Sequence, residues 1–285
     1  MNITTVRIKY VDYQITKEIG CGGQGGVYSA VNDKGHSIAV KITDFTQRGK
    51  WKNFYQETNA IKDIQPWKHE YLCNVIEIKE NSDYGVIAMD KYDCDLYDCI
   101  EKNGFSEDLG RTIFQKICIG LKSLHSCNIA HLDIKPENIM MDLKTITPYI
   151  GDYGCCYNFT HNKKCSLIGG TEIFHPPEYA SSDPYNPLKS DVFSLGVTLH
   201  LMLTGYYPYD IEEDVNKRKI FIDDDISPFC RNLIFKMLQT NPKKRISLDE
   251  VMNHPWVTNA KKQSKIRKVT HSISKNAKNI FKWSK

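Results

Sequence analysis

Residues 131–138 read HLDIKPEN, and residues 152–154 read DYG. Both segments place carboxylate or amide side chains among apolar neighbours, near the middle of a chain of 285 residues. A third segment, GCGGQGGV at residues 20–27, lies far upstream and is followed by Lys41. The order and spacing of these segments decide how the remaining sequence is interpreted.

The chain around the glycine-rich segment is expected to form strands. Alternate residues of 27–31 and of 38–42 share one face, which is the period-two pattern of strands. Residues 32–35, NDKG, have the composition of a hairpin turn between them. Residues 51–64 show helical spacing of their apolar side chains instead. The first part of the chain therefore predicts a small antiparallel sheet carrying one helix.

The pattern becomes helical after Asp95. Ser106 precedes acidic residues and a face of apolar residues at helical spacing, which is typical of a helix N-terminus. Residues 191–204 are apolar nearly all round and predict a buried helix. Ser247 and Glu250 have the spacing of a capping box before another helix. A mainly helical second part is therefore expected after the sheet.

The glycine-rich segment contains the pattern G-x-G-x-x-G-x-V. Taken alone, this pattern is equally compatible with an ordinary glycine-rich turn. A dinucleotide-binding fold would need the glycines to open a helix, whereas here they join two expected strands. The placement favours a flap whose backbone lies over phosphate groups.

Lys41 lies on the next expected strand and has apolar neighbours. A lone lysine on a strand usually faces solvent, but a lysine that reaches phosphates needs a carboxylate to hold it. Glu57 is the only glutamate between Lys41 and His69, and it lies on the expected helix. The sequence therefore predicts a Lys41–Glu57 pair.

Together, these segments resemble the motifs of eukaryotic-type serine/threonine protein kinases. Later segments agree with the resemblance: PPE at residues 176–178, DVFSLG at residues 191–196, and Arg245, which would pair with Glu178. The fold implied is α+β and bilobal, with a small N-terminal lobe made of an antiparallel β-sheet and one helix. Its C-terminal lobe would be larger and mainly α-helical.

The resemblance implies a protein kinase domain over residues 13–257. Its N-lobe would span about residues 13–88, its hinge about residues 89–93 and its C-lobe about residues 94–257. Residues 258–285 would form a basic C-terminal tail.

The resemblance also implies transfer of the γ-phosphoryl group of ATP to protein serine or threonine hydroxyls, with Mg²⁺ as cofactor. Asp133 would act as the catalytic base, and Lys135 would neutralise the moving phosphoryl group. Asn138 would be catalytic as well, because it would hold Mg²⁺ together with Asp152 through side-chain oxygen atoms. Thr171 would support Asp133, and both Thr171 and Lys135 resemble serine/threonine rather than tyrosine kinases.

The nucleotide would lie between the two lobes. Met89 would guard the back of the adenine pocket, with the backbone of residues 90–93 as the hinge. The nucleotide-binding residues implied by the resemblance are Gly20, Cys21, Gly22, Gly23, Gln24, Gly25, Val27, Ala39, Lys41, Glu57, Met89, Asp90 and Met140.

Two positions depart from the family pattern. Leu132 stands where an arginine usually binds a phosphate on the activation segment, so we expect basal activity that does not require phosphorylation there. Tyr153 replaces a phenylalanine and adds a hydroxyl that needs a partner. With His131 and Ile61, Tyr153 is expected to form an internal column anchored by Asp191.

Two other functions share part of the pattern. A non-catalytic scaffold with the same fold would not need to keep Lys41, Asp133 and Asp152 together. A small-molecule phosphotransferase of related fold would share the metal-binding carboxylates. It would not be expected to carry the segment that leads to Glu178 together with Arg245.

Composition limits the class of protein. With 41% apolar and 25% charged residues, and no run of about 18 apolar residues, the chain predicts a globular protein without a transmembrane segment. The first ten residues alternate apolar and polar side chains, unlike a signal peptide, so we expect a cytoplasmic or nuclear location. The ten cysteines are scattered, and the closest groupings, such as Cys94 with Cys99, lack zinc spacing, so free thiols are expected.

Charge is uneven along the chain, which has a net charge of +4. Residues 261–285 contain nine basic residues, no acidic residue, and apolar residues at helical spacing. Such a tail is typical of contact with calmodulin, an anionic membrane or nucleic acid. A solvated extension fits the same composition equally well.

Overall fold

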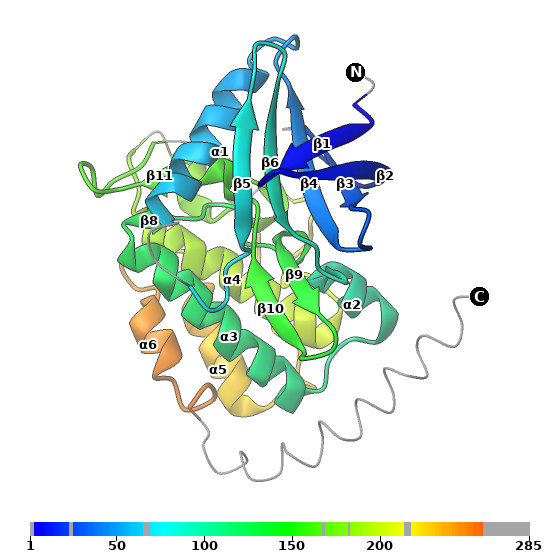
Figure 1. The fold of residues 1–285 in the computed structure, drawn as a ribbon. Helices are drawn as coiled ribbons and strands as arrows, with labels where there is room; N and C mark the ends of the chain where they lie inside the picture. Colours follow the sequence, from blue (N-terminus) through cyan, green and yellow to red (C-terminus); the bar gives the residue numbers. More distant parts are fainter. Residues whose placement is uncertain are drawn as a thin grey trace.

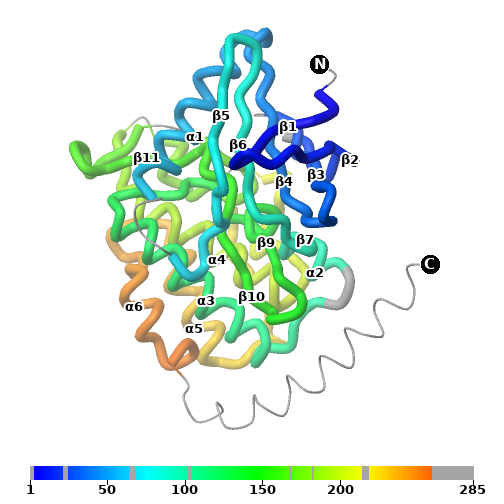
Figure 2. Tube along the Cα trace, in the orientation of Figure 1, coloured from blue at the N-terminus to red at the C-terminus, as the bar shows by residue number. Residues whose placement is uncertain are grey.

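The computed structural model describes residues 3–22, 25–64, 69–166, 169–181, 183–213 and 218–258, except the side chains of residues 22, 102 and 103. A sheet-rich N-terminal part lies above a mainly helical C-terminal part in Figure 1. The chain trace in Figure 2 passes from one part to the other through the segment between β6 and β7. The predicted α+β class and two-lobe arrangement are confirmed.

One antiparallel sheet forms the N-terminal part, with the strand order β1-β2-β3-β4-β6-β5. Helix α1 (Lys50–Ile64) packs against this sheet, as the sequence predicts. The strands are β1 (Thr5–Ile8), β2 (Val11–Gly22), β3 (Gly25–Val31), β4 (Ser37–Asp44), β5 (Val75–Glu80) and β6 (Tyr84–Asp90).

Strand β4 is central in the sheet and is buried on both faces. Ile38 and Val40 point into a small core on the outer face of the sheet. Because side chains alternate along a strand, Ala39 and Lys41 point to the opposite face. This alternation brings the Lys41 amine to the side on which α1 lies.

Strand β1 covers the outer face of the sheet. Val6 and Ile8 are buried in the same small core as Ile38 and Val40. β1 pairs with β2, so the sheet begins at Thr5, upstream of the expected start of the N-lobe. The hydrophobic effect explains this additional strand, because it removes the apolar outer face of the central strands from water.

The predicted hairpin turn joins β3 to β4. Gly35 has a φ of 77°, and its N–H donates to the carbonyl of Asn32 at 3.0 Å. The Asn32 side-chain oxygen accepts from the N–H groups of Lys34 and His36. Glycine is suited to this position because it adopts a left-handed conformation without a steric cost.

Helices and short strands build the C-terminal part (Figure 1). The helices are α2 (Leu96–Asn103), α3 (Glu107–Ser126), α4 (Pro187–Thr204), α5 (Pro228–Met237) and α6 (Leu248–Met252). The strands are β7 (Cys94–Asp95), β8 (Ile129–Ala130), β9 (Ile139–Asp142), β10 (Thr147–Ile150) and β11 (Tyr157–Asn158). Short 3₁₀ turns are η1 (Pro136–Asn138), η2 (Tyr153–Cys155), η3 (Glu172–Phe174) and η4 (Pro177–Ala180).

The predicted helix starts are confirmed. The Ser106 hydroxyl caps α3 by accepting a hydrogen bond from Leu109 N at 3.4 Å. Ser247 and Glu250 form the capping box of α6. Helix α4 is buried over residues 190–202, as its apolar circumference predicts.

A continuous apolar core joins the two parts. Phe54 of α1 and Ile87 of β6 belong to the same buried cluster as Phe114 of α3 and Trp256, which follows α6. The sheet is therefore held to the helical part by apolar packing as well as by polar contacts. Across the described residues, no helix combines the length and apolarity needed to cross a membrane.

Arg245 and Glu178 form a buried ion pair in the C-terminal part. Arg245 Nη1 lies 2.6 Å from Glu178 Oε1, and Nη2 lies 2.8 Å from Oε2. The guanidinium also donates to the carbonyls of Gln239 and Lys189. The ion pair expected from the sequence is therefore formed, and two backbone carbonyls hold the guanidinium in addition to Glu178.

We predict that Arg245→Met lowers the free energy of unfolding by about 3–5 kcal/mol, because the Glu178 carboxylate is left buried and unpaired. Arg7→Met is the control, since the Arg7–Asp12 pair is exposed and is expected to contribute less than about 1 kcal/mol. Urea unfolding measures both variants. Equal losses would contradict the importance assigned to the buried pair.

Candidate active site

A buried lysine lies where the sheet meets α1. Lys41 Nζ is 2.9 Å from Glu57 Oε1 and 2.8 Å from Oε2. Strand β4 supplies the lysine and α1 supplies the glutamate, and the two residues are only 6% and 3% exposed. The structure thus shows the pair that the sequence predicts.

Asp152 joins this pair from the C-terminal part. Its Oδ1 lies 3.0 Å from Lys41 Nζ and also accepts a hydrogen bond from Gly154 N at 3.3 Å. Asp152 has a φ of 52°, a left-handed conformation that costs on the order of 1–3 kcal/mol for a residue other than glycine. The ion pair with Lys41 and the contact with Gly154 stabilise this conformation.

Charge pairing shifts the pKa values of these groups. Burial alone would lower the pKa of Lys41, but the Glu57 and Asp152 carboxylates raise it above its ordinary value. Burial would raise the pKa of Asp152, but the neighbouring Lys41 ammonium lowers it below the ordinary value. The lysine is therefore a cation and the aspartate an anion near neutral pH.

Asp133 lies at the centre of a second set of contacts. Asn138 Nδ2 donates to Asp133 Oδ2 at 2.9 Å and to its carbonyl oxygen at 2.8 Å. Lys135 Nζ is 3.2 Å from Asp133 Oδ2 and donates to Thr171 Oγ1 at 2.5 Å. The N–H of Thr171 donates to Asp133 Oδ1 at 2.8 Å. Lys135, Asn138 and Thr171, the other residues expected to be catalytic, thus all contact Asp133.

The two sets of contacts are joined through the backbone. Gly151 N donates to the carbonyl of Asn138 at 2.9 Å, and Asp152 follows directly in the chain. Asn138 is therefore the link between Asp152, which contacts Lys41, and Asp133. Residues that are far apart in the sequence converge on one place between the two parts.

Asp191 anchors the loop that carries Asp133. Its carboxylate is fully buried and accepts hydrogen bonds from His131 N at 2.9 Å and Leu132 N at 2.7 Å. His131 and Tyr153 are buried, with their ring centroids 6.3 Å apart. The Tyr153 hydroxyl donates to the carbonyls of Ile150 and Cys73, which satisfies the additional group noted in the sequence.

The flap strands β2 and β3 pair with Cys21 opposite Gly26 and Gly22 opposite Gly25. The glycines thus join two strands, as expected. A Cβ atom at Gly25 would lie 2.4 Å from the carbonyl oxygen of Ile42, so β3 and β4 leave no space for a side chain there. The predicted contacts of Gly23 and Gln24 lie outside the described residues.

The other residues expected at the nucleotide lie on neighbouring strands. Ala39 of β4 pairs with Met89 of β6, and Met140 of β9 pairs with Asp95 of β7. The Asp90 side chain instead accepts a hydrogen bond from Asn74. Gly20 pairs with Val27, and Val27 pairs with Lys41.

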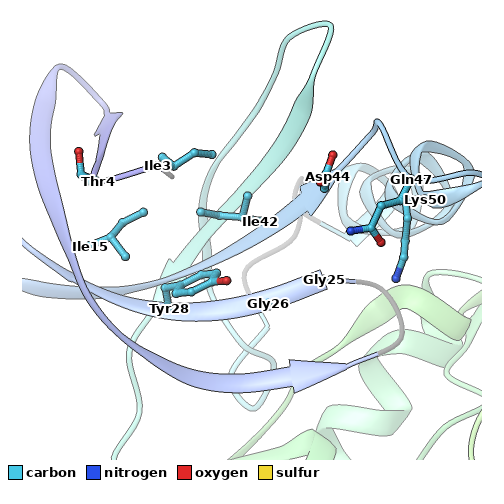
Figure 3. A pocket seen from close by; sticks show the side chains of 10 residues that line it. All are labelled: Ile3, Thr4, Ile15, Gly25, Gly26, Tyr28, Ile42, Asp44, Gln47 and Lys50. Atoms are coloured by element: carbon cyan, nitrogen blue, oxygen red, sulfur yellow. The ribbon is translucent and has the colours of Figure 1, made fainter. Parts of the chain in front are cut away.

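Two cavities lie outside the cluster of Lys41, Asp152 and Asp133, although each includes a residue expected at the nucleotide. One, of about 450 Å³, is on the outer face of the sheet and is lined by Ile15, Tyr28 and Lys50, with Gly25 and Gly26 of the flap (Figure 3). The other, of about 950 Å³, is lined by the expected hinge residues 90–93, among other residues. Lys41, Asp133 and Asp152 line neither cavity.

Asn138 and Asp152 supply oxygen donors that fit Mg²⁺. Both hydrogen bonds of the Asn138 amide nitrogen go to Asp133, so its carboxamide oxygen remains available as an acceptor. Asp152 is 43% exposed at its side chain despite its contact with Lys41. Mg²⁺ retains several waters and substrate phosphate oxygens, so two protein ligands are a suitable set. The described residues contain no group of three or more His, Cys, Asp and Glu side chains that could hold a metal.

Gly170 is a positioning residue that sequence reasoning missed. Its φ is 87°, and a Cβ atom there would lie 2.4 Å from the Leu132 carbonyl oxygen and 3.0 Å from Asp133 Oδ1. Only glycine permits this close approach, which brings the N–H of Thr171 onto Asp133. The two adjacent glycines before Thr171 could have indicated in the sequence that the backbone needs a glycine there.

The fold and these converging side chains are those of the protein kinase class. Residues 13–257 match the family model described as the protein kinase domain. The SNF1-related protein kinase catalytic subunit alpha KIN12 of Arabidopsis thaliana is 30% identical over 260 residues, covering 87% of this chain and 52% of that protein. The serine/threonine-protein kinase pim-2 of Danio rerio is 29% identical over 263 residues, covering 86% and 84%.

The chain belongs to the protein kinase family. The SNF-related serine/threonine-protein kinase of Homo sapiens is also similar, with 29% identity over 257 residues that cover 86% of this chain. This chain spans about a third of the human relative's length and about half of the Arabidopsis relative's length.

We predict that Lys41→Met and Asp152→Asn each reduce kcat at least as strongly as Asp133→Asn. Positioning can supply roughly 7–11 kcal/mol of a barrier, whereas general base catalysis contributes about 10²–10⁴ in rate. Steady-state phosphoryl transfer measures the variants, with Lys62→Met on the exposed face of α1 as the matched control. Near-normal transfer by Lys41→Met would refute the role assigned to this lysine.

Proposed function

We propose that this chain transfers the γ-phosphoryl group of MgATP to serine and threonine hydroxyls of protein substrates. One observation carries the proposal, namely the connected set of contacts in which Lys41 binds Asp152, the adjacent Gly151 binds Asn138, and Asn138 binds Asp133. This set places the Lys41 cation, which would bind phosphates, beside the oxygen donors that would bind the metal. It also places the Asp133 carboxylate, which would act on the substrate hydroxyl, next to them.

Each residue has a physical role in this reaction. Lys41, held by Glu57, binds the phosphates of ATP and orients them. Asp133 accepts or orients the proton of the attacking hydroxyl, and Lys135 compensates negative charge on the transferred group. Asn138 and Asp152 would hold Mg²⁺, which supplies neutralisation of phosphate charge when it is bound.

The preference for serine and threonine rests on Lys135 and Thr171. Lys135 lies beside Asp133, and its amine contacts the Thr171 hydroxyl. Both residues match the pattern of serine/threonine kinases. The similar proteins from Arabidopsis, zebrafish and human are named as protein kinases, the last two as serine/threonine-protein kinases.

The direct test is incubation with labelled ATP, Mg²⁺ and a mixed protein substrate, followed by hydrolysis and identification of the labelled amino acid. We expect phosphoserine and phosphothreonine, with Asp152→Asn as the inactive control. Label in a small molecule alone would indicate a small-molecule phosphotransferase. Absence of any transfer, in a protein that is folded, would indicate a scaffold.

We further propose that activity does not depend on phosphorylation of the activation segment. Leu132, in place of the phosphate-binding arginine, is buried with Cys165, Tyr179 and Tyr185. Cys165 and Tyr185 exchange two backbone hydrogen bonds of 2.8 Å across this cluster. Apolar packing therefore anchors the segment where an arginine–phosphate contact would otherwise do so.

We predict that phosphatase treatment leaves kcat unchanged, whereas Leu132→Ala lowers kcat because it opens a cavity beside the segment. Kinetics and phosphopeptide mapping of the treated wild type measure the first effect. Thr160→Ala and Ser166→Ala should match the wild type. Loss of activity on dephosphorylation would show that a phosphate is required.

We also propose that the basic tail contacts an anionic partner in the cytoplasm or nucleus. The support is its charge, since residues 261–285 carry nine basic residues and no acidic one, and they lie outside the described residues.

Truncation at Ala260 should preserve kinase activity but abolish binding to calcium-loaded calmodulin, anionic vesicles or duplex DNA, and change the cellular location. Equal binding and location of both forms would contradict this role.

A further inference from the structure

Cys94 and Cys99 bring two thiols together at the start of α2. Asp95 is the N-cap residue of this helix, because its carboxylate accepts a hydrogen bond from Asp98 N at 2.8 Å. Cys94 therefore precedes the cap, and Cys99 is the fourth residue of the helix. These two positions pack together in a hydrophobic staple. The Sγ atoms of the two cysteines lie 3.5 Å apart.

Packing alone accounts for part of this arrangement. Cysteine behaves as a small apolar side chain, so the pair stabilises the helix entry whether or not the thiols react. The same geometry also holds the two sulfur atoms in direct non-bonded contact. From the 3.5 Å separation, a disulfide bond of about 2.05 Å requires a closure of roughly 1.5 Å. Side-chain rotation together with an adjustment of the backbone between Cys94 and Cys99 would supply such a movement.

The backbone on both sides of the pair is held in place. Cys94 pairs with Met141 of β9, and Asp93 N donates to the Met141 carbonyl at 3.1 Å. On the helix, Leu96 and Ile100 are buried in the large core. The two thiols are therefore kept near one another by the fold, which favours reaction within the pair.

Access separates this pair from the buried cysteines. Cys94 and Cys99 are both partly exposed residues that also pack against the large core. Cys73, Cys118 and Cys230 are buried, and burial raises the pKa of each thiol above its ordinary value. A buried thiol with a raised pKa is a poor nucleophile.

We propose that Cys94 and Cys99 form a modification site, a dithiol that a hydroperoxide oxidises to an intramolecular disulfide. One thiolate attacks the peroxide, the O–O bond breaks, and a sulfenic acid and an alcohol or water are formed. The second thiol attacks the sulfenic sulfur, the S–S bond forms, and water leaves with the thiol proton. The two sulfurs lose two electrons and the hydroperoxide gains them. A dithiol reductant reverses the reaction by exchange.

Closure of the bond ties β7 to α2 across Asp95. Asp95 pairs with Met140 of β9, a residue expected at the nucleotide. The second part of the proposal rests on the proposed function: the disulfide raises the KM for ATP several-fold, and reduction restores it.

The test treats the full chain with hydrogen peroxide, blocks free thiols with iodoacetamide and analyses tryptic peptides by mass spectrometry. Residues 92–102 form one tryptic peptide that contains both cysteines. We expect this peptide to be lighter by two hydrogen atoms and to take up no iodoacetamide until it is reduced. This measurement does not depend on kinase activity.

Cys94→Ser and Cys99→Ser should each abolish the lighter peptide, whereas Cys127→Ser, at another partly exposed cysteine, should retain it. The KM for ATP after peroxide should rise in the wild type and Cys127→Ser but not in the first two variants.

Unoxidised thiols in this peptide, at a peroxide dose that oxidises the partly exposed Cys127, would overturn the disulfide site. An unchanged KM in the disulfide form would overturn the coupling to ATP. Absence of kinase activity in the untreated protein bears on the proposed function alone.

Discussion

The buried ammonium group of Lys41 is the constraint on which the arrangement of this protein depends. A buried cation costs several kcal/mol unless carboxylates and hydrogen bonds compensate for its lost hydration. Glu57 comes from α1 and Asp152 from the segment after β10, so compensation is complete only when both are in place. The positive charge of Lys41 thus links the position of α1, the position of the segment that carries Asp152, and the ability of Lys41 to bind phosphate.

A second buried charge organises the catalytic loop from the opposite side. Asp191 lies on α4, the helix that the core surrounds, and its carboxylate holds two successive backbone N–H groups of the loop. This support allows Leu132 to keep a φ of 61°, which is unfavourable for a side chain of its size. A rigid helix thereby sets the direction in which the next residue, Asp133, presents its carboxylate.

Features with local signals were predictable from the sequence. The β3–β4 hairpin follows from alternation and turn composition, and the start of α6 follows from the Ser247–Glu250 spacing. The partner of Lys41 could be predicted because Glu57 has no competing glutamate nearby. In each case a few neighbouring residues contain the information, and the tertiary structure agrees with it.

Features that arise from tertiary packing were not predictable. The packing of β1 depends on which face of β4, a strand distant in the sequence, is apolar and not covered by α1. The apolar cluster around Leu132 forms only when segments from separate parts of the chain meet. The need for glycine at position 170 comes from a carbonyl almost forty residues upstream, that of Leu132. No local periodicity encodes such proximity.

The hydroxyl of Tyr153 also has a consequence for conformational freedom. Its hydrogen bonds to the Ile150 and Cys73 carbonyls attach the ring to the backbone of both parts of the protein. The hydroxyl has one proton, which the two carbonyls share, so together these contacts contribute about 0.5–1.5 kcal/mol, which a phenylalanine at this position could not provide. A small molecule whose binding requires this ring to swing out of its slot must first supply that energy. Such compounds should therefore bind this kinase less tightly than a kinase with phenylalanine in the same slot.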